Sequence, residues 1–421
     1  MRRHTLTAAI LASIALPALA ADERAVLATY ADIAEAAYGD SLATARALQD
    51  AVEAFLADPS AETHAAAKTA WLAARVPYQQ TEAYRFGNPV VDDWEGRVNA
   101  WPLDEGLIDY VAAEGSAPLE GTDENPAAGI NVIASPTFTL SGETVDATTI
   151  TPALLEDVLH EAGGAEANVA TGYHAVEFLL WGQDVGAYDA DAGQRAWTDY
   201  AAGGACTNGN CDRRADYLRA ATDLLVSDLE EMAAAWAEGG EARETALSDP
   251  NGVSRILTGM GSLSYGELAG ERMQLGLMLN DPEEEHSCFA DNTHNDHFYD
   301  ALGIRNVYEG RYVGVDGTVT EGTGLRAMVA EADPAVADAL AAALDATQAR
   351  MTELKLAAET GMPYDMMLDP GNEAGGALVQ AAVDALVAQT REIERAVAAL
   401  GAAEVTVEGS DSLDAPDAVF Q

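Results

Sequence analysis

The stretch DRRADYLRAATDLLVSDLEEMAAAWAE, residues 212–238, decides the fold class. Its large apolar residues recur at intervals of three or four, which places them along one face of an α-helix. They are Leu218, Leu224, Leu225, Leu229, Met232 and Trp236. Because a helix in a protein gains most of its stability by packing such a face against neighbours, the stretch predicts a bundle of helices.

The same periodicity recurs along most of the chain. It predicts further helices at residues 23–57, 61–84, 152–160, 165–181, 252–279, 327–359 and 375–400. Glycine, proline and threonine punctuate residues 115–150, which are expected to form a long connection with one short hairpin. Residues 86–103 are expected to be an ordered loop, and Asp104 is expected to cap a short helix that follows it.

These elements predict an all-α protein made of two related helical bundles, of the tandem four-helix type, with a long irregular connection in the first. The first bundle is expected over residues 21–205 and the second over residues 206–401, followed by a loose acidic tail at 402–421. A weak internal repeat favours the relation between the bundles. GYHAVE at 172–177 and GELAGE at 266–271 each place a glycine five residues before a glutamate.

Residues 1–20, MRRHTLTAAILASIALPALA, carry two arginines, an apolar run and a small-residue cleavage site, a pattern typical of a secretory signal peptide. No later stretch reaches the roughly 18 to 20 apolar residues of a membrane span. We therefore expect an exported protein, periplasmic or secreted, with no transmembrane segment. The formal charge of −48 repels nucleic acid and anionic lipid, which excludes nucleic-acid binding from the expected functions.

The chain has three cysteines. Cys206 and Cys211 enclose a polar loop with glycine and asparagine turn residues, and an exported protein can oxidise such a pair to a disulfide. A metal thiolate pair is the alternative, although its usual spacing is shorter. Cys288 is left over.

A histidine and a glutamate stand three residues apart in TGYHAVEFLLWGQD, residues 171–184. On a helix this spacing puts His174 and Glu177 on one face, where both can converge on a metal ion. The alternative is an internal hydrogen bond, or a salt bridge from Glu177 to an arginine. Three arginines are candidates for that partner: Arg75, Arg85 and Arg272. The longer His-Glu-x-x-His signature of zinc peptidases is absent.

A second group of polar residues occurs in EEEHSCFADNTHND, residues 283–296. Three of the seven histidines of the chain lie within residues 286–297. The group contains five side chains able to bind a transition metal: His286, Cys288, Asp291, His294 and Asp296. Alternatively, the segment is a polar loop that caps the next helix.

TGYHAVEFLLWGQD resembles the Gly-x-His-x-x-Glu signature of the imelysin-like family, and HSCFADNTHND resembles that family's second characteristic segment. NAWPLDEGLIDYV (99–111) and CTNGNCDRRADYL (206–218) are similar to further family segments in the same order. The resemblance implies an exported, all-α protein of two related bundles, with His174 and Glu177 near the cleft between them. Members are linked to iron acquisition and are often labelled peptidases.

The leading hypothesis is a periplasmic metal-binding or iron-uptake accessory protein with its site between the bundles, His174 and Glu177 acting as ligands. Iron or zinc is the expected metal, free or as a chelate, and an outer-membrane uptake component is a candidate partner. Side chains from the second bundle that would complete the site are Glu271, His286, Asp291 and His294. A zinc metallopeptidase using the same pair, with Glu271 or Asp291 as base, is the rival.

A third hypothesis comes from another class of protein. It is a module that binds a polysaccharide or a partner protein without metal, through an aromatic floor in the cleft. Trp94, Trp101 and Trp181 would form that floor.

Overall fold

The structure is a computed structural model that describes residues 16–111, 125–186 and 188–420. Most of the expected signal peptide therefore lies outside the described residues, and so does part of the expected connection at 115–150. Within the described ranges no helix is both long enough and apolar enough to cross a membrane.

Four helices form the first bundle: α1 (Leu16–Ala57), α2 (Ala61–Gln79), α5 (Gly172–Trp181) and α6 (Cys211–Trp236). Helix α1 packs along both α2 and α6, and α5 contacts α2 and α6. A capping box begins α2, because Ser60 and Thr63 each accept a hydrogen bond from the other's backbone N–H. Pro77 lies in its last turn, and the helix ends at Gln79 instead of continuing to Tyr84.

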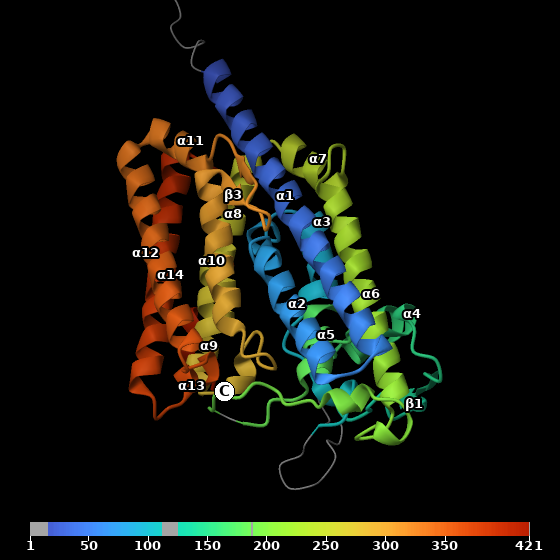
Figure 1. Cartoon of the computed structure of the whole chain (residues 1–421). Coiled ribbons are helices and arrows are strands. Elements are labelled where there is room, and N and C mark those ends of the chain that lie inside the picture. Colours follow the sequence, from blue (N-terminus) through green and yellow to red (C-terminus); the bar gives the residue numbers. More distant parts are fainter. Residues whose placement is uncertain (1–15, 112–124, 187, 421) are drawn as a thin grey trace, which may run out of the picture.

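Four helical segments form the second bundle, which Figure 1 shows in yellow to red beside the blue and green first bundle. The first segment consists of three consecutive elements: α8 (Gly252–Ser262), a π-helical stretch (Leu263–Gln274) and α9 (Leu275–Leu279). The other three are α10 (Thr293–Glu309), α12 (Pro334–Glu359) and α14 (Glu373–Leu400). Helix α12 packs against α10 and α14, and α14 packs against the π-helical stretch.

Shorter elements complete the described chain. The helices are α3 (Pro89–Asn99), α4 (Pro152–Leu154), α7 (Glu241–Ser248), α11 (Leu325–Ala332), α13 (Tyr364–Leu368) and α15 (Asp411–Asp414). Short 3₁₀ turns lie between them, and a π-helical turn, Leu155–Leu159, continues α4. Strands β1 (Thr137–Leu140) and β2 (Glu143–Asp146) form one antiparallel hairpin, and β3 (Arg311–Val313) and β4 (Val319–Glu321) form another. The prediction of an all-α fold is confirmed, and the hairpin expected within residues 115–150 is β1–β2.

Three local expectations were wrong. Asp104 precedes only a 3₁₀ turn, Glu105–Leu107, and its side chain does not cap it. Residues 86–103 contain α3, which Asn88 caps by accepting the Val90 N–H and which Pro89 begins with a pre-set φ. The helix expected from residue 165 begins only at Gly172, whose φ is +77°. A Cβ there would lie 2.5 Å from the Val98 carbonyl oxygen, so a glycine is needed where α5 meets α3.

The division between the bundles lies farther along the chain than the expected boundary at residues 205 and 206. Helix α6 packs along α1, and α7 contacts α1 and α6, so the first bundle extends through α7. The turn residues and cysteines of the 206–211 loop mark a corner within that bundle. In that loop Cys206 and Cys211 form a disulfide, which holds the first residue of α6.

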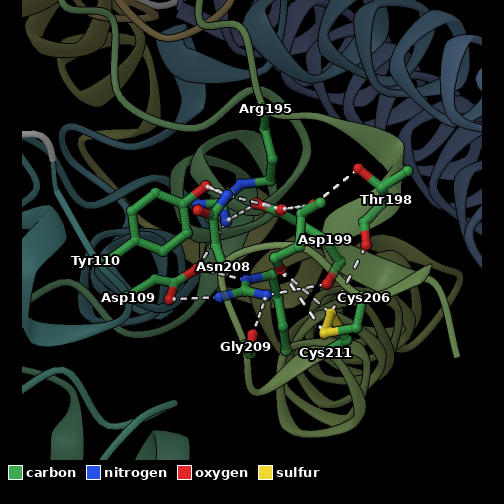
Figure 2. Close-up of a disulfide and its surroundings, with 11 residues drawn as sticks. Asp109, Tyr110, Arg195, Thr198, Asp199, Cys206, Asn208, Gly209 and Cys211 are labelled. Carbon is green, nitrogen blue, oxygen red and sulfur yellow. Dashed lines mark hydrogen bonds and ion pairs between the residues drawn. A yellow bond between two sulfur atoms is a disulfide. The ribbon is translucent and has the colours of Figure 1, made fainter. Parts of the chain in front are cut away.

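Figure 2 shows the disulfide beside a buried ionic cluster. Asp109 Oδ2 accepts hydrogen bonds from Arg195 Nη1 and Arg214 Nε, each at 2.6 Å. All three side chains are almost fully buried. The cluster joins the 105–109 turn to the start of α6, so it stabilises the corner of the first bundle.

The C-terminal tail is attached to the second bundle, which corrects the expectation of a loose tail at 402–421. The Glu408 N–H donates to Ser262 Oγ at 3.1 Å, and Ser412 Oγ donates to the Gly270 carbonyl oxygen at 3.0 Å. A Cβ on Gly270 would lie 2.3 Å from Ser410 Cβ. The glycines of GELAGE therefore allow the C-terminal tail to approach closely, whereas Gly172 of GYHAVE allows the close approach of α3.

Reciprocal ion pairs join the two bundles in their buried interface. Arg75 of α2 contacts Asp296 of α10, with 3.3 Å between Nε and Oδ1. In the opposite direction Arg272 of the second bundle contacts Glu82 of the first, with 2.7 Å between Nη2 and Oε2. The apolar residues around these pairs form one continuous core across both bundles. The halves therefore form one folded unit.

Candidate functional site

Helix α5 places His174 and Glu177 at the interface between the bundles, where both are at most 1% exposed. His174 Nδ1 lies 2.9 Å from Glu177 Oε2. The other carboxylate oxygen, Oε1, accepts the backbone N–H of Ala290 at 2.9 Å, and Ala290 belongs to the second bundle. Both oxygens of Glu177 therefore have internal partners.

The second bundle contributes a matching pair. His286 precedes α10, and its Nδ1 lies 3.0 Å from Asp296 Oδ2. Arg75 Nη2 and Gln79 Nε2 each lie 3.3 Å from the same ring nitrogen. Arg75 also donates to Asn99 Oδ1 at 2.7 Å, so first-bundle side chains surround the second pair.

The two histidines meet across the interface. Their ring centroids are 4.8 Å apart, with an angle of 76° between the planes. Each Nδ1 faces a carboxylate, and neither Nε2 has a hydrogen-bond partner among the described residues. Both residues line a pocket of about 340 Å³ that lies between the bundles. Two imidazoles, each with an Nε2 that lacks a partner among the described residues, therefore line one pocket.

The buried surroundings favour neutral imidazoles. Burial, followed by the charge of Arg75, lowers the pKa of His174 well below its usual range. Burial and then Arg272 lower the pKa of His286 to about 4. A neutral imidazole whose Nδ1–H donates to a carboxylate has a lone pair on Nε2, and metal-binding histidines commonly have this arrangement.

The two carboxylates differ in charge. Burial acts to raise the pKa of Asp296, but Arg75 and His286 hold it well below its usual range, so Asp296 is ionised and accepts the His286 Nδ1–H. Burial raises the pKa of Glu177 well above its usual range against the opposing effect of Arg75. Without a metal the Glu177–His174 pair therefore retains one extra proton, and it must release that proton for the His174 Nδ1–H to donate to an ionised Glu177 and for Nε2 to bind a metal.

Three expected second-bundle contributors lie outside the described lining of this pocket. Glu271 raises the pKa of Glu284 from nearby. Asp291 has a φ of +51° and lies among other aspartates that, together with burial, raise its pKa to about 8. His294 Nε2 lies 3.0 Å from Asn295 Nδ2. Of the expected contributors, only His286 joins His174 at the pocket.

The alternatives for Glu177 and for the tryptophans also have clear outcomes. Glu177 contacts His174 and Ala290, whereas the nearest expected arginine, Arg75, forms its ion pair with Asp296. Of the three tryptophans expected to form an aromatic floor, only Trp101 lines the pocket, 5.7 Å from the His286 ring between centroids. Trp94 and Trp181 pack elsewhere in the first bundle. The expected aromatic floor is not assembled.

Several pocket residues were missed from the sequence. Gln79 and Asn99 contact the histidine network, and Asp104 and Glu105 line the pocket. They lie 69 to 207 residues from His174 and His286 in the sequence and have no distinctive spacing, so no local pattern marks them. Cys288, which was left over in the cysteine pairing, also lines the pocket.

A protein metal site usually has several donor side chains around one point. In the described part of the chain no three or more His, Cys, Asp or Glu side chains are grouped so as to hold a metal ion. The two Nε2 atoms are nitrogen donors of the kind that iron and zinc accept, and they lack internal partners. The residues therefore fit a metal that keeps part of its coordination shell from water or a ligand.

The comparisons with known proteins agree with this fold. The family model for imelysin, peptidase family M75, matches residues 34–393. The iron-regulated protein A of Synechococcus elongatus is 30% identical over 88 residues, which is 21% of this chain and 24% of that protein. The chain thus matches about a quarter of the length of this curated relative.

Two solved structures have a similar fold. An iron-regulated protein A precursor from Parabacteroides distasonis superimposes with a TM-score of 0.64 at 18% identity, over 90% of this chain and 95% of that one. An imelysin-like protein from Psychrobacter arcticum gives a TM-score of 0.56 at 17% identity, over 91% of this chain and 96% of that one. With the family match over most of its length, this chain belongs to the imelysin family.

Proposed function

We propose that this protein is an exported, iron-related binding protein that holds a metal ion in the pocket between its bundles. Nε2 of His174 and Nε2 of His286 would be its ligands from the chain. The observation that carries the proposal is a pair of buried imidazoles, one from each bundle, that line the same pocket and whose Nε2 atoms both lack a partner among the described residues. The names of the relatives, iron-regulated protein A, favour iron over zinc.

In this proposal Glu177 orients His174 and does not bind the metal. Its two oxygens are engaged by His174 Nδ1 and the Ala290 N–H. Asp296 has the same role for His286, and its charge is balanced by Arg75. Such carboxylates fix the ring tautomer and make the imidazole more basic. A bound metal ion would act as a Lewis acid or as cargo, and the chain's residues would hold it and keep Nδ1 protonated.

The zinc-peptidase hypothesis has less support from the site. A hydrolytic zinc site needs three protein ligands, an open position and a base. The described lining offers two imidazoles and several carboxyl groups, but no three of these donors are grouped so as to hold a metal ion among the described residues, and neither Glu271 nor Asp291 is part of the lining. Cys288 lines the pocket, but burial and then Glu283 raise the pKa of its thiol well above the usual range, so it is protonated at neutral pH.

The test is a titration of Fe²⁺ or Zn²⁺ into tag-free protein by calorimetry, with His174→Ala and His286→Ala as variants. We expect one bound ion per chain and at least a tenfold loss of affinity in each variant. His294→Ala is the matched control, since His294 lies in the same segment as His286 but outside the described lining of the pocket. Equal affinity in all four proteins would refute the proposal.

A further inference from the structure

The pocket that ends on the two imidazoles has an acidic wall. Asp104 and Glu105 contribute carboxylates from the first bundle, and Glu283 and Glu284 from the second. Among the described residues that line it there is neither a lysine nor an arginine. The wall therefore places carboxyl groups on both sides of the interface.

These carboxylates have no cationic partner among the described residues. None of the four forms an ion pair there, and the amide of Asn125 donates to Asp104 Oδ2. Burial and then Glu283 raise the pKa of Glu105 to about 7. Burial and then Asp281 raise the pKa of Glu283 to about 7 as well, so both groups are mostly charged above neutral pH. The acidic groups thus repel one another without internal compensation.

The nearest buried cation does not cancel this charge. Arg75 lies behind the imidazoles, outside the described lining of the pocket, and forms its ion pair with Asp296 at 3.3 Å. Its Nη1 donates to Asn99 Oδ1. Because Asp296 balances the charge of Arg75, the uncompensated charge that faces the pocket is that of the wall.

We propose that the pocket admits metal as a hydrated cation and excludes anionic chelates, with Glu105 and Glu283 as the specificity-determining residues. The inference rests on the proposed function and names its ligand class. Carboxylates of citrate or of an acidic sugar would meet like charge on opposite walls, whereas water molecules on a cation can donate hydrogen bonds to the same oxygens. Repulsion of the wrong partner is an effective source of specificity in a poorly solvated pocket.

Two sources of iron test the inference. The tag-free full chain is incubated at about pH 8, above the pKa of about 7 of both Glu105 and Glu283. The iron source is ferrous chloride without oxygen, or ferric citrate in air with isotopically labelled citrate. Protein is separated from small molecules, and iron and citrate are counted. We expect iron from either source to bind without citrate, and Glu105→Gln/Glu283→Gln to lower the affinity for Fe²⁺ at least tenfold.

A control variant removes the same charge elsewhere. Glu62→Gln/Glu238→Gln changes two exposed acids outside the pocket lining and should keep wild-type affinity, which separates the wall from the overall field of the protein. If the wild-type protein retains iron and citrate in equal amounts and His174→Ala loses both, the inference is overturned but the proposed function stands. No iron bound from either source would refute the proposed function, and the inference with it.

Discussion

Replacing Asp296 with asparagine removes the negative charge that balances the buried Arg75 behind the pocket. The carboxylate is fully buried, 3.3 Å from Arg75 Nε and 3.0 Å from His286 Nδ1. In the variant Arg75 keeps only neutral acceptors, such as Asn99 Oδ1 at 2.7 Å. Because removing one partner of a buried ion pair costs about 3–5 kcal/mol, we expect the free energy of unfolding to fall by that amount.

Guanidinium unfolding, followed by circular dichroism, measures this loss. The matched control is Asp338→Asn, which removes the charge of a side chain that is 80% exposed and lies 3.6 Å from Arg326, and it should change stability by less than about 0.5 kcal/mol. Asp296→Asn should also weaken metal binding, because His286 Nδ1 would accept from Arg75 and Nε2 would carry the proton. A loss of stability as small as that of the control would refute the assigned role of the Arg75–Asp296 pair.

Three further perturbations have defined outcomes. Glu177→Gln should reduce metal affinity by about 10- to 100-fold in calorimetry, as expected of a carboxylate that orients His174; unchanged affinity would contradict that role. In the folded state the pKa of His286 is lowered to about 4. The contribution of its neutral imidazole to the free energy of unfolding is therefore complete above about pH 6.5 and falls by about 1.4 kcal/mol per pH unit as the pH is lowered towards 4. Acid unfolding of His286→Gln should therefore show a shallower dependence on pH, and an unaltered slope would count against a buried neutral imidazole. Changing both Cys206 and Cys211 to serine should lower the free energy of unfolding by about 2 kcal/mol, because the disulfide closes a short loop; stability equal to that of the wild type would show that the corner holds without it.

Helical periodicity was sufficient to predict the fold class and most of the long helices. The apolar stripe of residues 212–238 is the buried face of α6, and its last member, Trp236, stacks on Tyr38 of α1. The boundary of the first bundle was not predictable in the same way. Turn residues and cysteines at 206–211 look like a linker, and only the contact of α6 with α1 shows that the chain turns a corner there.

The site was predictable in part. The spacing of His174 and Glu177 correctly put them on one helical face, but the sequence does not show which atoms face the pocket. The backbone N–H of Ala290, which is 113 residues farther along the chain, donates to Glu177 Oε1. The carboxylate that was expected to be a ligand therefore has internal partners. The meeting of His174 with His286 likewise depends on packing between bundles. Side chains brought together by packing of distant elements leave no local periodicity in the sequence.

The most direct test of two imidazoles converging from opposite bundles is the position of a bound metal. A crystal soaked in Zn²⁺ or grown with Fe²⁺, with data collected at the metal's absorption edge, gives that position from anomalous scattering. We predict one strong peak within about 2.0–2.2 Å of Nε2 of both His174 and His286, with Glu177 still bound to His174 Nδ1. A peak on the Glu177 carboxylate, or at a place that involves neither imidazole, would contradict the account.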